Sequence, residues 1–212
     1  MTETTPGRLS GRRAQAARND QLILDSARAV FLADPAAPIT AVAKHAGVGI
    51  SALYSRYGSK EELLRKLCSD GLETFVAETE AALADDRDHW VVLASYMRRL
   101  VDADTSSMTV ALAGTFTPTA EMFALAARGG QLLGELVDRV SDALRPGVGA
   151  HDLSVITELV ASVREPDASR TRELRQRYLA VILDGLRAGH SAPLPASPPT
   201  WQEISGRWQP AT

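Results

Sequence analysis

The chain has 212 residues, 45% of them hydrophobic and 5% aromatic, with one cysteine and a formal net charge of −3. One cysteine excludes an intramolecular disulfide, and the lack of an apolar run near ~20 residues excludes a membrane-spanning protein. The charge is uneven, since residues 1–66 hold 10 basic and 6 acidic side chains and residues 67–212 hold 13 and 20. A polyanion therefore binds best at the basic N-terminal end. No secretory signal opens the chain, so we expect a cytoplasmic protein.

Residues 1–18 hold four arginines, Arg8, Arg12, Arg13 and Arg18, without apolar periodicity, which predicts a flexible basic arm. The arm is either a solvated tail or a segment that contacts phosphate or the DNA minor groove. A helix is predicted from Asn19, a capping residue, to the prolines at 35 and 38. Its inward face carries Ile23, Ala27, Val30 and Phe31.

Two short helices follow, at 39–46 and 50–57, separated by Gly47, which suits the left-handed position that ends a helix. Ser59 and the two glutamates after Lys60 resemble a capping box, which predicts a long helix from Ser59 to about Leu83. At ~1.5 Å per residue this helix is long enough to connect two domains.

The rest of the chain continues with helical patterns and no strand-like alternation. Helices are predicted near 89–103, 106–113, 119–144, 151–164 and 169–188. Residues 191–200 are too rich in proline for a helix, but Thr200 and Glu203 could cap one final turn. The expected fold is all-α. Its predicted parts are the arm (1–18), a three-helix DNA-binding domain (19–66), a helical ligand-binding and dimerisation domain (67–190) and a proline-rich C-terminal tail (191–212).

The two short helices and the start of the long one carry a specific sequence pattern. Its residues are Ile39, Thr40, Val42, Ala43, Ala46, Gly47, Val48, Leu53, Tyr54, Tyr57, Ser59, Lys60, Glu61 and Leu63. The pattern resembles the helix-turn-helix signature of the TetR (tetracycline-repressor-like) family of transcriptional regulators. The alternative is an ordinary helical hairpin, which the joint presence of Gly47, Tyr54 and Lys60 in a basic segment disfavours.

A helix-turn-helix buries one face of its second helix and leaves the other face free for base edges. Val48, Leu53 and Tyr57 are predicted to pack inward. The predicted DNA-binding residues are Thr40, Gly49, Ile50, Ser51, Ala52, Tyr54, Ser55 and Lys60. The outward side chains of the second helix are small and neutral, and none can form the bidentate arginine contact to guanine. Hydroxyl contacts, thymine methyl groups and DNA shape would then supply the specificity.

The resemblance implies roles for three of these residues. Thr40 and Lys60 match positions that contact backbone phosphates, and Tyr54 matches a tyrosine that packs on the sugar-phosphate backbone or a thymine methyl. Such contacts fix register rather than sequence. Gly49 departs from the family pattern, which has a capping serine there, and Tyr57 replaces the usual phenylalanine.

Two apolar stripes near the C-terminus predict a homodimer. The predicted interface residues are Leu153, Ile156, Val160 and Val163 on one helix and Leu174, Tyr178, Val181 and Ile182 on the next. The resemblance also implies a four-helix interface between subunits. The alternative is that both stripes face the core of their own subunit.

A ligand cavity is predicted in the middle of the chain, where the resemblance implies that the fourth to eighth helices enclose one. The candidate lining residues are Phe75, Tyr96, Met97, Met108, Phe116, Met122 and Phe123. Because charged residues are scarce there, we expect a largely apolar ligand. The alternative is that these residues are plain core. Cys68 is interpreted as a packing residue rather than a redox switch.

The predicted function is that of a DNA-binding transcriptional regulator, a repressor released from its operator by a small ligand. One alternative is a small-molecule binding protein without specific DNA binding. An enzyme is the other, but no catalytic constellation is evident in the sequence. The four histidines are dispersed, so neither a metal nor a cofactor is expected.

Overall fold

The computed structural model describes residues 7–189 and 192–208. Side chains are described from Gln15 onward, apart from those of Ala16 and Arg207. Every helix in this part of the chain is too short or too polar to span a lipid bilayer.

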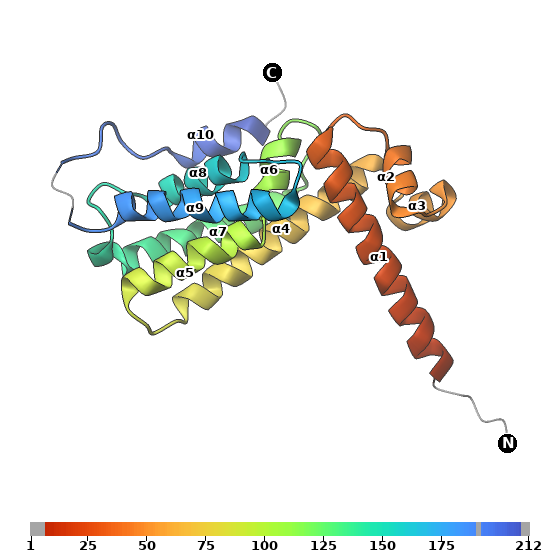
Figure 1. The fold of residues 1–212 in the computed structure, drawn as a ribbon, viewed down its shortest axis with the longest axis horizontal. Helices are drawn as coiled ribbons and strands as arrows, with labels where there is room; N and C mark the ends of the chain where they lie inside the picture. Colours follow the sequence, from red (N-terminus) through yellow and green to blue (C-terminus); the bar gives the residue numbers. More distant parts are fainter. Residues whose placement is uncertain (1–6, 190–191, 209–212) are drawn as a thin grey trace. The chain divides into compact units, whose positions relative to one another are not determined.

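The predicted all-α class is confirmed. Within the described ranges the regular structure consists of helices, and strand-type pairing is limited to one antiparallel bridge between Leu144 and Arg187 (Figure 1). The chain divides into two compact units, Met1–Leu67 and Cys68–Thr212. Each unit has its own site, so each is described separately.

The first unit contains three complete helices and the beginning of a fourth. They are α1 (Gly7–Ala33), α2 (Ile39–Ala46), α3 (Ile50–Tyr57) and α4 (Lys60–Leu83). Helices α2 and α3 have the predicted bounds, and Ser59 caps α4 by accepting a hydrogen bond from the amide of Glu62, 3.1 Å long. Gly47 ends α2 with φ at +66°, the left-handed conformation that glycine adopts without strain.

Helix α1 begins earlier than the sequence predicted. It starts at Gly7 rather than Asn19, so residues 7–18, expected as part of a flexible arm, are helical. A non-helical segment was predicted because the stretch contains glycines and lacks an apolar periodicity. Its alanine, arginine and glutamine residues, however, favour a helix. The start of the predicted arm, residues 1–6, lies outside the described residues.

The core of the first unit is small and aliphatic, with two aromatic rings. Phe31 on α1 and Leu53 on α3 are fully buried, and Tyr57 is nearly so. The buried hydrophobic residues are Ile23, Leu24, Ala27, Phe31, Ala37, Ile39, Val42, Ala43, Ala46, Leu53, Tyr57, Leu63, Leu64 and Leu67. This confirms the predicted inward packing of Leu53 and Tyr57, and it fixes which face of α3 is exposed.

The second unit contains the rest of α4 and six further α-helices. They are α5 (His89–Asp102), α6 (Ser107–Leu112), α7 (Ala120–Arg139), α8 (Ala150–Ala161), α9 (Ala168–Leu186) and α10 (Trp201–Ser205). Helix α5 packs against α8 and α9, and α8 also packs against α6 and α7. Helix α7 is shorter than predicted, because the chain after Arg139 turns into a short 3₁₀ helix and then the Leu144–Arg187 bridge.

A buried arginine joins three elements of the second unit. Arg175 on α9 is 7% exposed, and its guanidinium binds the Asp104 carboxylate at 2.7 Å and the Ser107 hydroxyl at 3.1 Å. It also donates to the carbonyl oxygens of Ala161 and Val163, 2.7 and 3.0 Å away, at the end of α8. All three nitrogens of the guanidinium thus donate a hydrogen bond, which lowers the penalty for burying the charge.

The C-terminal residues also differ from the expectation of a tail. Residues 192–200 lack a helix, as predicted, and Thr200 and Glu203 form the predicted capping box at the start of α10. In Figure 1 this segment returns along the second unit beside α8. We refer to residues 192–208 as the C-terminal segment.

Candidate functional sites

The outward face of α3 is the candidate DNA-reading surface. Ser51, Ala52, Tyr54 and Ser55 are exposed, and Ile50 is partly exposed. Tyr54 is 46% exposed, which is unusual for a large aromatic residue on a short helix. The structure therefore brings the predicted reading residues to one surface, while the opposite face of α3 anchors the helix in the core.

A polar clamp holds α3 against α1. The Asp20 carboxylate accepts two hydrogen bonds from the Arg56 guanidinium, at 2.8 and 2.7 Å, and one from the Tyr57 hydroxyl at 2.5 Å. Arg56 and Tyr57 together lower the pKa of Asp20 from 3.8 to about 2, because both stabilise the charged carboxylate. Burial, with the same carboxylate beside the ring, raises the pKa of Tyr57. The tyrosine that departs from the family pattern thus has a structural partner on α1.

The two predicted phosphate-contacting residues have different surroundings. Thr40 is exposed near the start of α2. Lys60 donates from Nζ to the carbonyl oxygen of Pro35 at 3.1 Å, and its Nζ lies 5.1 Å from the centre of the Phe31 ring. Because an ammonium group has three donors, the bond to Pro35 leaves capacity for a phosphate oxygen.

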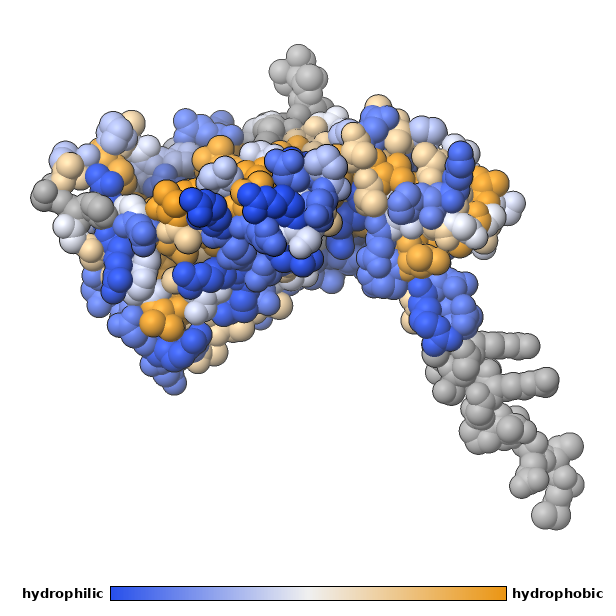
Figure 2. All heavy atoms as spheres, viewed as in Figure 1, coloured by the Kyte–Doolittle hydropathy of each residue, from blue (hydrophilic) through white to orange (hydrophobic). Residues whose placement is uncertain are grey.

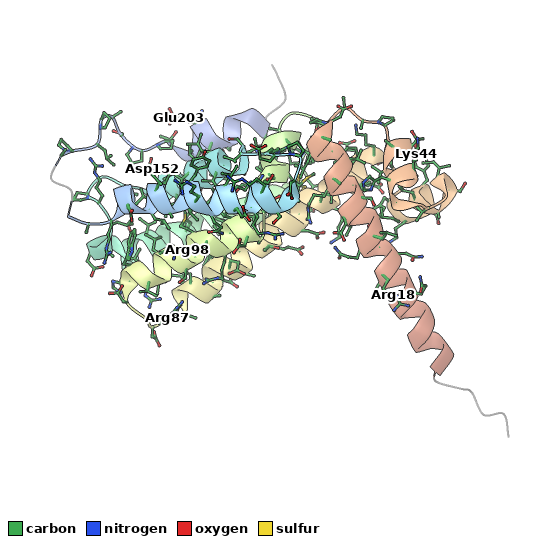
Figure 3. The ribbon with its side chains drawn as sticks, viewed as in Figure 1. Arg18, Lys44, Arg87, Arg98, Asp152 and Glu203 are labelled. Carbon is green, nitrogen blue, oxygen red and sulfur yellow. The ribbon has the colours of Figure 1, made fainter. Side chains whose placement is uncertain are left out.

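Gly49 precedes α3 in an extended conformation and offers no side-chain cap. A Cβ atom added there meets nothing within 4 Å, so the site has room for a larger residue. The same unit carries exposed basic side chains, including Lys44 on α2 and Arg18 on α1 (Figure 3). These charges fit the electrostatic part of binding to phosphate.

The second unit contains a cavity of about 170 Å³. Its lining comes from α4, α6, α7, α8, α10 and the loops around them. The lining residues are Cys68, Gly71, Leu72, Phe75, Thr105, Ser106, Thr109, Pro118, Met122, Phe123, Ala126, Gly130, His151, Ser154, Thr157, Glu158, Trp201, Ile204, Ser205 and Trp208. The cavity is thus built from segments that are far apart in the sequence.

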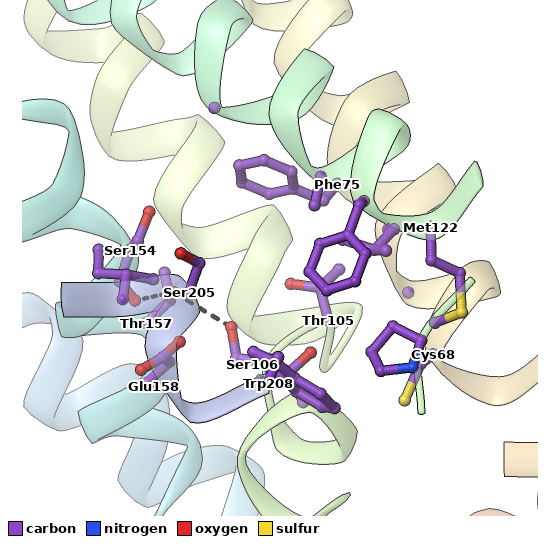
Figure 4. A pocket seen from close by; sticks show the side chains of 18 of the residues that line it. Cys68, Phe75, Thr105, Ser106, Met122, Ser154, Thr157, Glu158, Ser205 and Trp208 are labelled. Atoms are coloured by element: carbon purple, nitrogen blue, oxygen red, sulfur yellow. Dashed lines mark hydrogen bonds between the residues drawn. The ribbon is translucent and has the colours of Figure 1, made fainter. Parts of the chain in front are cut away.

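The cavity has an apolar side and a polar side. Figure 4 shows Phe75 and Met122 on one side, with Ser154, Thr157 and Ser205 gathered on the other. The Ser106 hydroxyl donates to that of Thr157 at 3.1 Å, and Thr157 donates to the carbonyl oxygen of Ser154 at 2.7 Å. Such an arrangement suits a molecule with an apolar body and a polar group at one end.

Three of the seven predicted ligand-binding residues line this cavity, namely Phe75, Met122 and Phe123. The other four do not. Tyr96 and Met97 are fully buried in the helical core, where the Tyr96 hydroxyl lies 2.9 Å from that of Thr79. Met108 is buried beside the cavity rather than in its lining, and Phe116 contacts Trp208 instead. Helical spacing could not separate these residues, because core and cavity faces share the same periodicity.

The sequence interpretation missed the cavity residues outside the mid-chain segment. Trp201 and Trp208 belong to the C-terminal segment, and Cys68 lies on α4. Cys68 is 5% exposed, and burial raises the pKa of its thiol to about 12, so it is a neutral wall residue. Two tryptophans within eight residues of each other near a chain end were the available signal, because exposed tryptophans are rare without a partner.

The predicted interface residues on α8 and α9 fall into two groups. Tyr178 and Val181 on α9 are 46% and 66% exposed, and Leu159 on α8, a neighbour of the predicted residues, is 60% exposed. Ile156, Val163, Leu174 and Ile182 are partly exposed. Leu153 and Val160, in contrast, are buried in the core of their own subunit. In Figure 2, hydrophobic and hydrophilic spheres lie side by side on the second unit.

A three-helix unit whose second short helix is buried on one face and exposed on the other is the arrangement of a helix-turn-helix. Residues 23–67 match the family model described as bacterial regulatory proteins of the tetR family. This stretch therefore matches the DNA-binding domain of the tetR family. A search of curated protein sequences gave no match.

Solved structures share the fold over most of the chain. The ketosteroid transcriptional regulator KstR2 of Mycobacterium tuberculosis is 17% identical with a TM-score of 0.63, covering 81% of this chain and 96% of its own. The TetR regulator SCO0520 of Streptomyces coelicolor is 23% identical, with a TM-score of 0.54 and coverages of 79% and 97%. LfrR of Mycobacterium smegmatis, solved with proflavine, is 20% identical, with a TM-score of 0.53 and coverages of 78% and 96%.

Proposed function

We propose that this chain is a cytoplasmic repressor. As a homodimer, it binds an operator through α3 and leaves the DNA when a small, largely apolar ligand enters the cavity of the second unit. The observation that carries the proposal is the exposed face of α3. Tyr54 and its small polar neighbours point outward, while Leu53 and Tyr57 anchor the helix inside a domain that matches the tetR model.

The side chains on α3 limit how this protein reads DNA. Tyr54, Ser51 and Ser55 offer hydroxyl contacts, and Ile50 and Ala52 offer methyl groups to thymine. None of them makes the bidentate contact of an arginine to guanine. Thr40, the amide of Gly49 and Lys60 would hold the phosphates, so DNA shape contributes to the choice of operator.

The dimer interface is assigned to the apolar residues of α8, of the turn after α8 and of α9 that are at least partly exposed. Its residues are Ile156, Leu159, Val163, Leu174, Tyr178, Val181 and Ile182. Leu153 and Val160 are left out because both are buried within their own subunit. A twofold dimer that presents its two α3 helices one DNA turn apart, ~34–36 Å, reads a palindromic operator.

Two relatives support an apolar ring compound as the ligand. One is described as a regulator of ketosteroids and another was solved with proflavine, a planar aromatic compound. The cavity of this chain combines Phe75, Phe123 and Trp208 with a row of hydroxyl groups. Such a ligand releases the DNA if it binds more tightly to the form with lower operator affinity.

Footprinting of the full chain on the DNA upstream of its own coding region tests the DNA-binding part. We expect protection of a palindrome, and we expect Tyr54→Ala or Thr40→Val to weaken binding about tenfold. Gln131→Ala, an exposed neutral position on α7 of the second unit, is the matched control and leaves binding unchanged. Binding to all sequences with equal affinity at every salt concentration would favour a ligand-binding protein without specific DNA binding.

Sedimentation velocity tests the interface. Val181→Arg places a charge on the exposed face of α9 and should yield a monomer, because an unpaired charge at the centre of an apolar interface is costly. Val91→Arg is the matched control, since Val91 on α5 is also an exposed valine of the second unit, at 40%. A dimer that survives Val181→Arg would move the interface to another face.

A further inference from the structure

The C-terminal segment is fastened to the second unit along its length. The Arg145 guanidinium donates to the carbonyl oxygen of Ala192 at 2.7 Å. The His151 ring donates from Nδ1 to the carbonyl oxygen of Pro199 at 2.8 Å, since a carbonyl can only accept. Between these two bonds, Pro198 lies so close to Gly149 that a Cβ atom added there would be 3.1 Å from it. The segment is therefore part of the folded unit.

Helix α10 presents a single face to the cavity. The capping box of Thr200 and Glu203 fixes its first turn, with Thr200 Oγ1 accepting from the Glu203 amide at 3.3 Å and the Glu203 carboxylate accepting from the Thr200 amide at 2.7 Å. Trp201, Ile204, Ser205 and Trp208 follow at helical spacing, and all four line the cavity. In a solvated tail, apolar residues would not be expected to lie together on one face.

Both tryptophan rings contact another aromatic ring. Trp201 lies with its ring centre 6.4 Å from that of His151 on α8. Trp208 meets Phe116 edge to face, with ring centres 5.7 Å apart and planes at 64°. Such contacts favour a defined ring position. The two rings thus stand at fixed places in the wall.

We propose that α10 and the residues up to Trp208 form a wall of the effector site and take part in ligand recognition. The ligand class is an aromatic molecule of one or two rings with one uncharged hydrogen-bonding group, such as a phenol. The inference rests on the proposed function, since it assigns the ligand of the same cavity.

Size and chemistry both lead to this class. The cavity holds about 170 Å³, and an apolar protein cavity of about 150 Å³ is known to hold benzene. The rings of Phe75, Phe123, Trp201 and Trp208 offer stacking and edge contacts to a flat molecule. Ser106, Ser154, Thr157 and Ser205 provide hydroxyl groups that both donate and accept, as a phenol hydroxyl does. The Glu158 carboxylate at this side of the cavity disfavours an anionic ligand.

Calorimetric titration of the full chain with three matched probes tests the ligand class. We expect 4-ethylphenol to bind, and ethylbenzene, which lacks the hydroxyl group, to bind about tenfold more weakly. We expect 4-ethylbenzoate to bind more weakly still, because its charge faces Glu158. Binding of the benzoate as tight as that of the phenol would overturn the assignment, as would no binding of 4-ethylphenol.

Tryptophan fluorescence tests whether Trp201 and Trp208 lie in the wall of the ligand site, and it does not depend on a change in ligand affinity. The chain has three tryptophans, and Trp90 on α5 lies outside the cavity lining. In Trp90→Phe, the remaining signal comes from Trp201 and Trp208, and 4-ethylphenol should change it. In the double variant Trp201→Phe with Trp208→Phe, only Trp90 remains and the change should vanish. A change carried by Trp90 instead would overturn the proposal.

A contact test completes the assignment. The double variant Trp201→Leu with Trp208→Leu should bind 4-ethylphenol about tenfold or more weakly, and Trp90→Leu should bind it as the natural chain does. Unchanged affinity in the double variant would remove the C-terminal segment from the site. Operator footprinting of the same variants without probe keeps the two proposals apart. If the natural chain shows no specific DNA binding, the proposed function fails. If specific DNA binding is present but the probe titrations fail, only the assignment of the wall fails.

Discussion

The two units of this chain build their sites in opposite ways. The first unit presents an exposed helix face, and one continuous stretch of 45 residues, 23–67, matches the family model for this region. The second unit encloses a cavity whose lining extends from Cys68 to Trp208. A convex reading surface needs only that a short helix be anchored on one side. A cavity requires several distant segments to converge, so small changes in packing alter its shape.

The two units also differ in how their charged groups are placed, at the surface in the first unit and in the interior in the second. Asp20 and Arg56 form a clamp at the edge of the first unit, where the Asp20 side chain is 20% exposed and that of Arg56 is 59% exposed. Arg175 in the second unit is 8% exposed in its side chain and bonded to four groups. Water therefore reaches the Arg56 guanidinium freely, whereas the Arg175 guanidinium is shielded although its partner Asp104 is 29% exposed. The following predictions test this contrast, from the largest expected effect to the smallest.

Arg175→Met should destabilise the second unit by about 3–4 kcal/mol, because it leaves the Asp104 carboxylate and two helix-end carbonyl groups without their partner. All three tryptophans belong to the second unit, so tryptophan fluorescence during urea unfolding reports on it. Arg172→Met on the exposed side of the same helix is the control and should change stability by less than about 0.5 kcal/mol. Equal effects of the two variants would contradict the structural role of Arg175.

Leu53→Ala should destabilise the first unit by about 3 kcal/mol, because a fully buried side chain is lost from a small core. Hydrogen exchange of the α2 and α3 amides measures the effect. Ser51→Ala, exposed on the same helix, should leave exchange nearly unchanged. Leu53→Ala could also lower the unfolding free energy reported by tryptophan fluorescence as much as that reported by exchange of the α3 amides. The two units would then unfold together, and the contrast between them would not extend to stability.

Asp20→Asn should cost about 1–2 kcal/mol at neutral pH, since it removes a charged acceptor shared by Arg56 and Tyr57, and solvent at Arg56 limits the loss. The pKa of Asp20 is about 2 in the folded chain against 3.8 ordinarily. Its contribution is therefore fully present above pH 3.8 and is lost as the pH falls toward 2.

Hydrogen exchange of α3 between these pH values should accelerate less in Asp20→Asn than in the natural chain. Asp25→Asn on the exposed side of α1 serves as the control and should keep the natural pH dependence. If Asp20→Asn lost protection of α3 as steeply as the natural chain over this range, another carboxylate would be responsible.

Gly49→Ser should stabilise the start of α3 by a few tenths of a kcal/mol, because serine caps a helix slightly better than glycine and the site has room for it. Exchange of the first α3 amides and footprinting affinity would both increase modestly. Gly47→Ser is the contrasting variant and should destabilise the unit by about 1 kcal/mol, since φ there is +66°. If Gly49→Ser and Gly47→Ser changed the stability of the unit by similar amounts, the backbone conformation would not distinguish the two glycines.

The sequence alone determined the parts that depend on neighbours in the chain. The bounds of α2 and α3, the inward positions of Leu53 and Tyr57 and the capping of α4 by Ser59 followed from periodicity and capping residues. The all-α class followed from the same helical patterns. DNA binding was predicted from the resemblance of the two short helices to a helix-turn-helix, a motif specified within one short stretch, and residues 23–67 match the tetR model.

Tertiary structure decided the remaining features, because these features depend on contacts between residues far apart in the sequence. The partner of Tyr57 is 37 positions away, and the residue that Lys60 bonds is 25 positions away. Periodicity assigned Tyr96 and Met97 to the cavity although they are core, and it assigned Leu153 and Val160 to the interface although they are buried. The C-terminal segment was expected as a tail, yet its tryptophans line the cavity. A helical pattern shows that a face is apolar, but only the fold determines what that face meets.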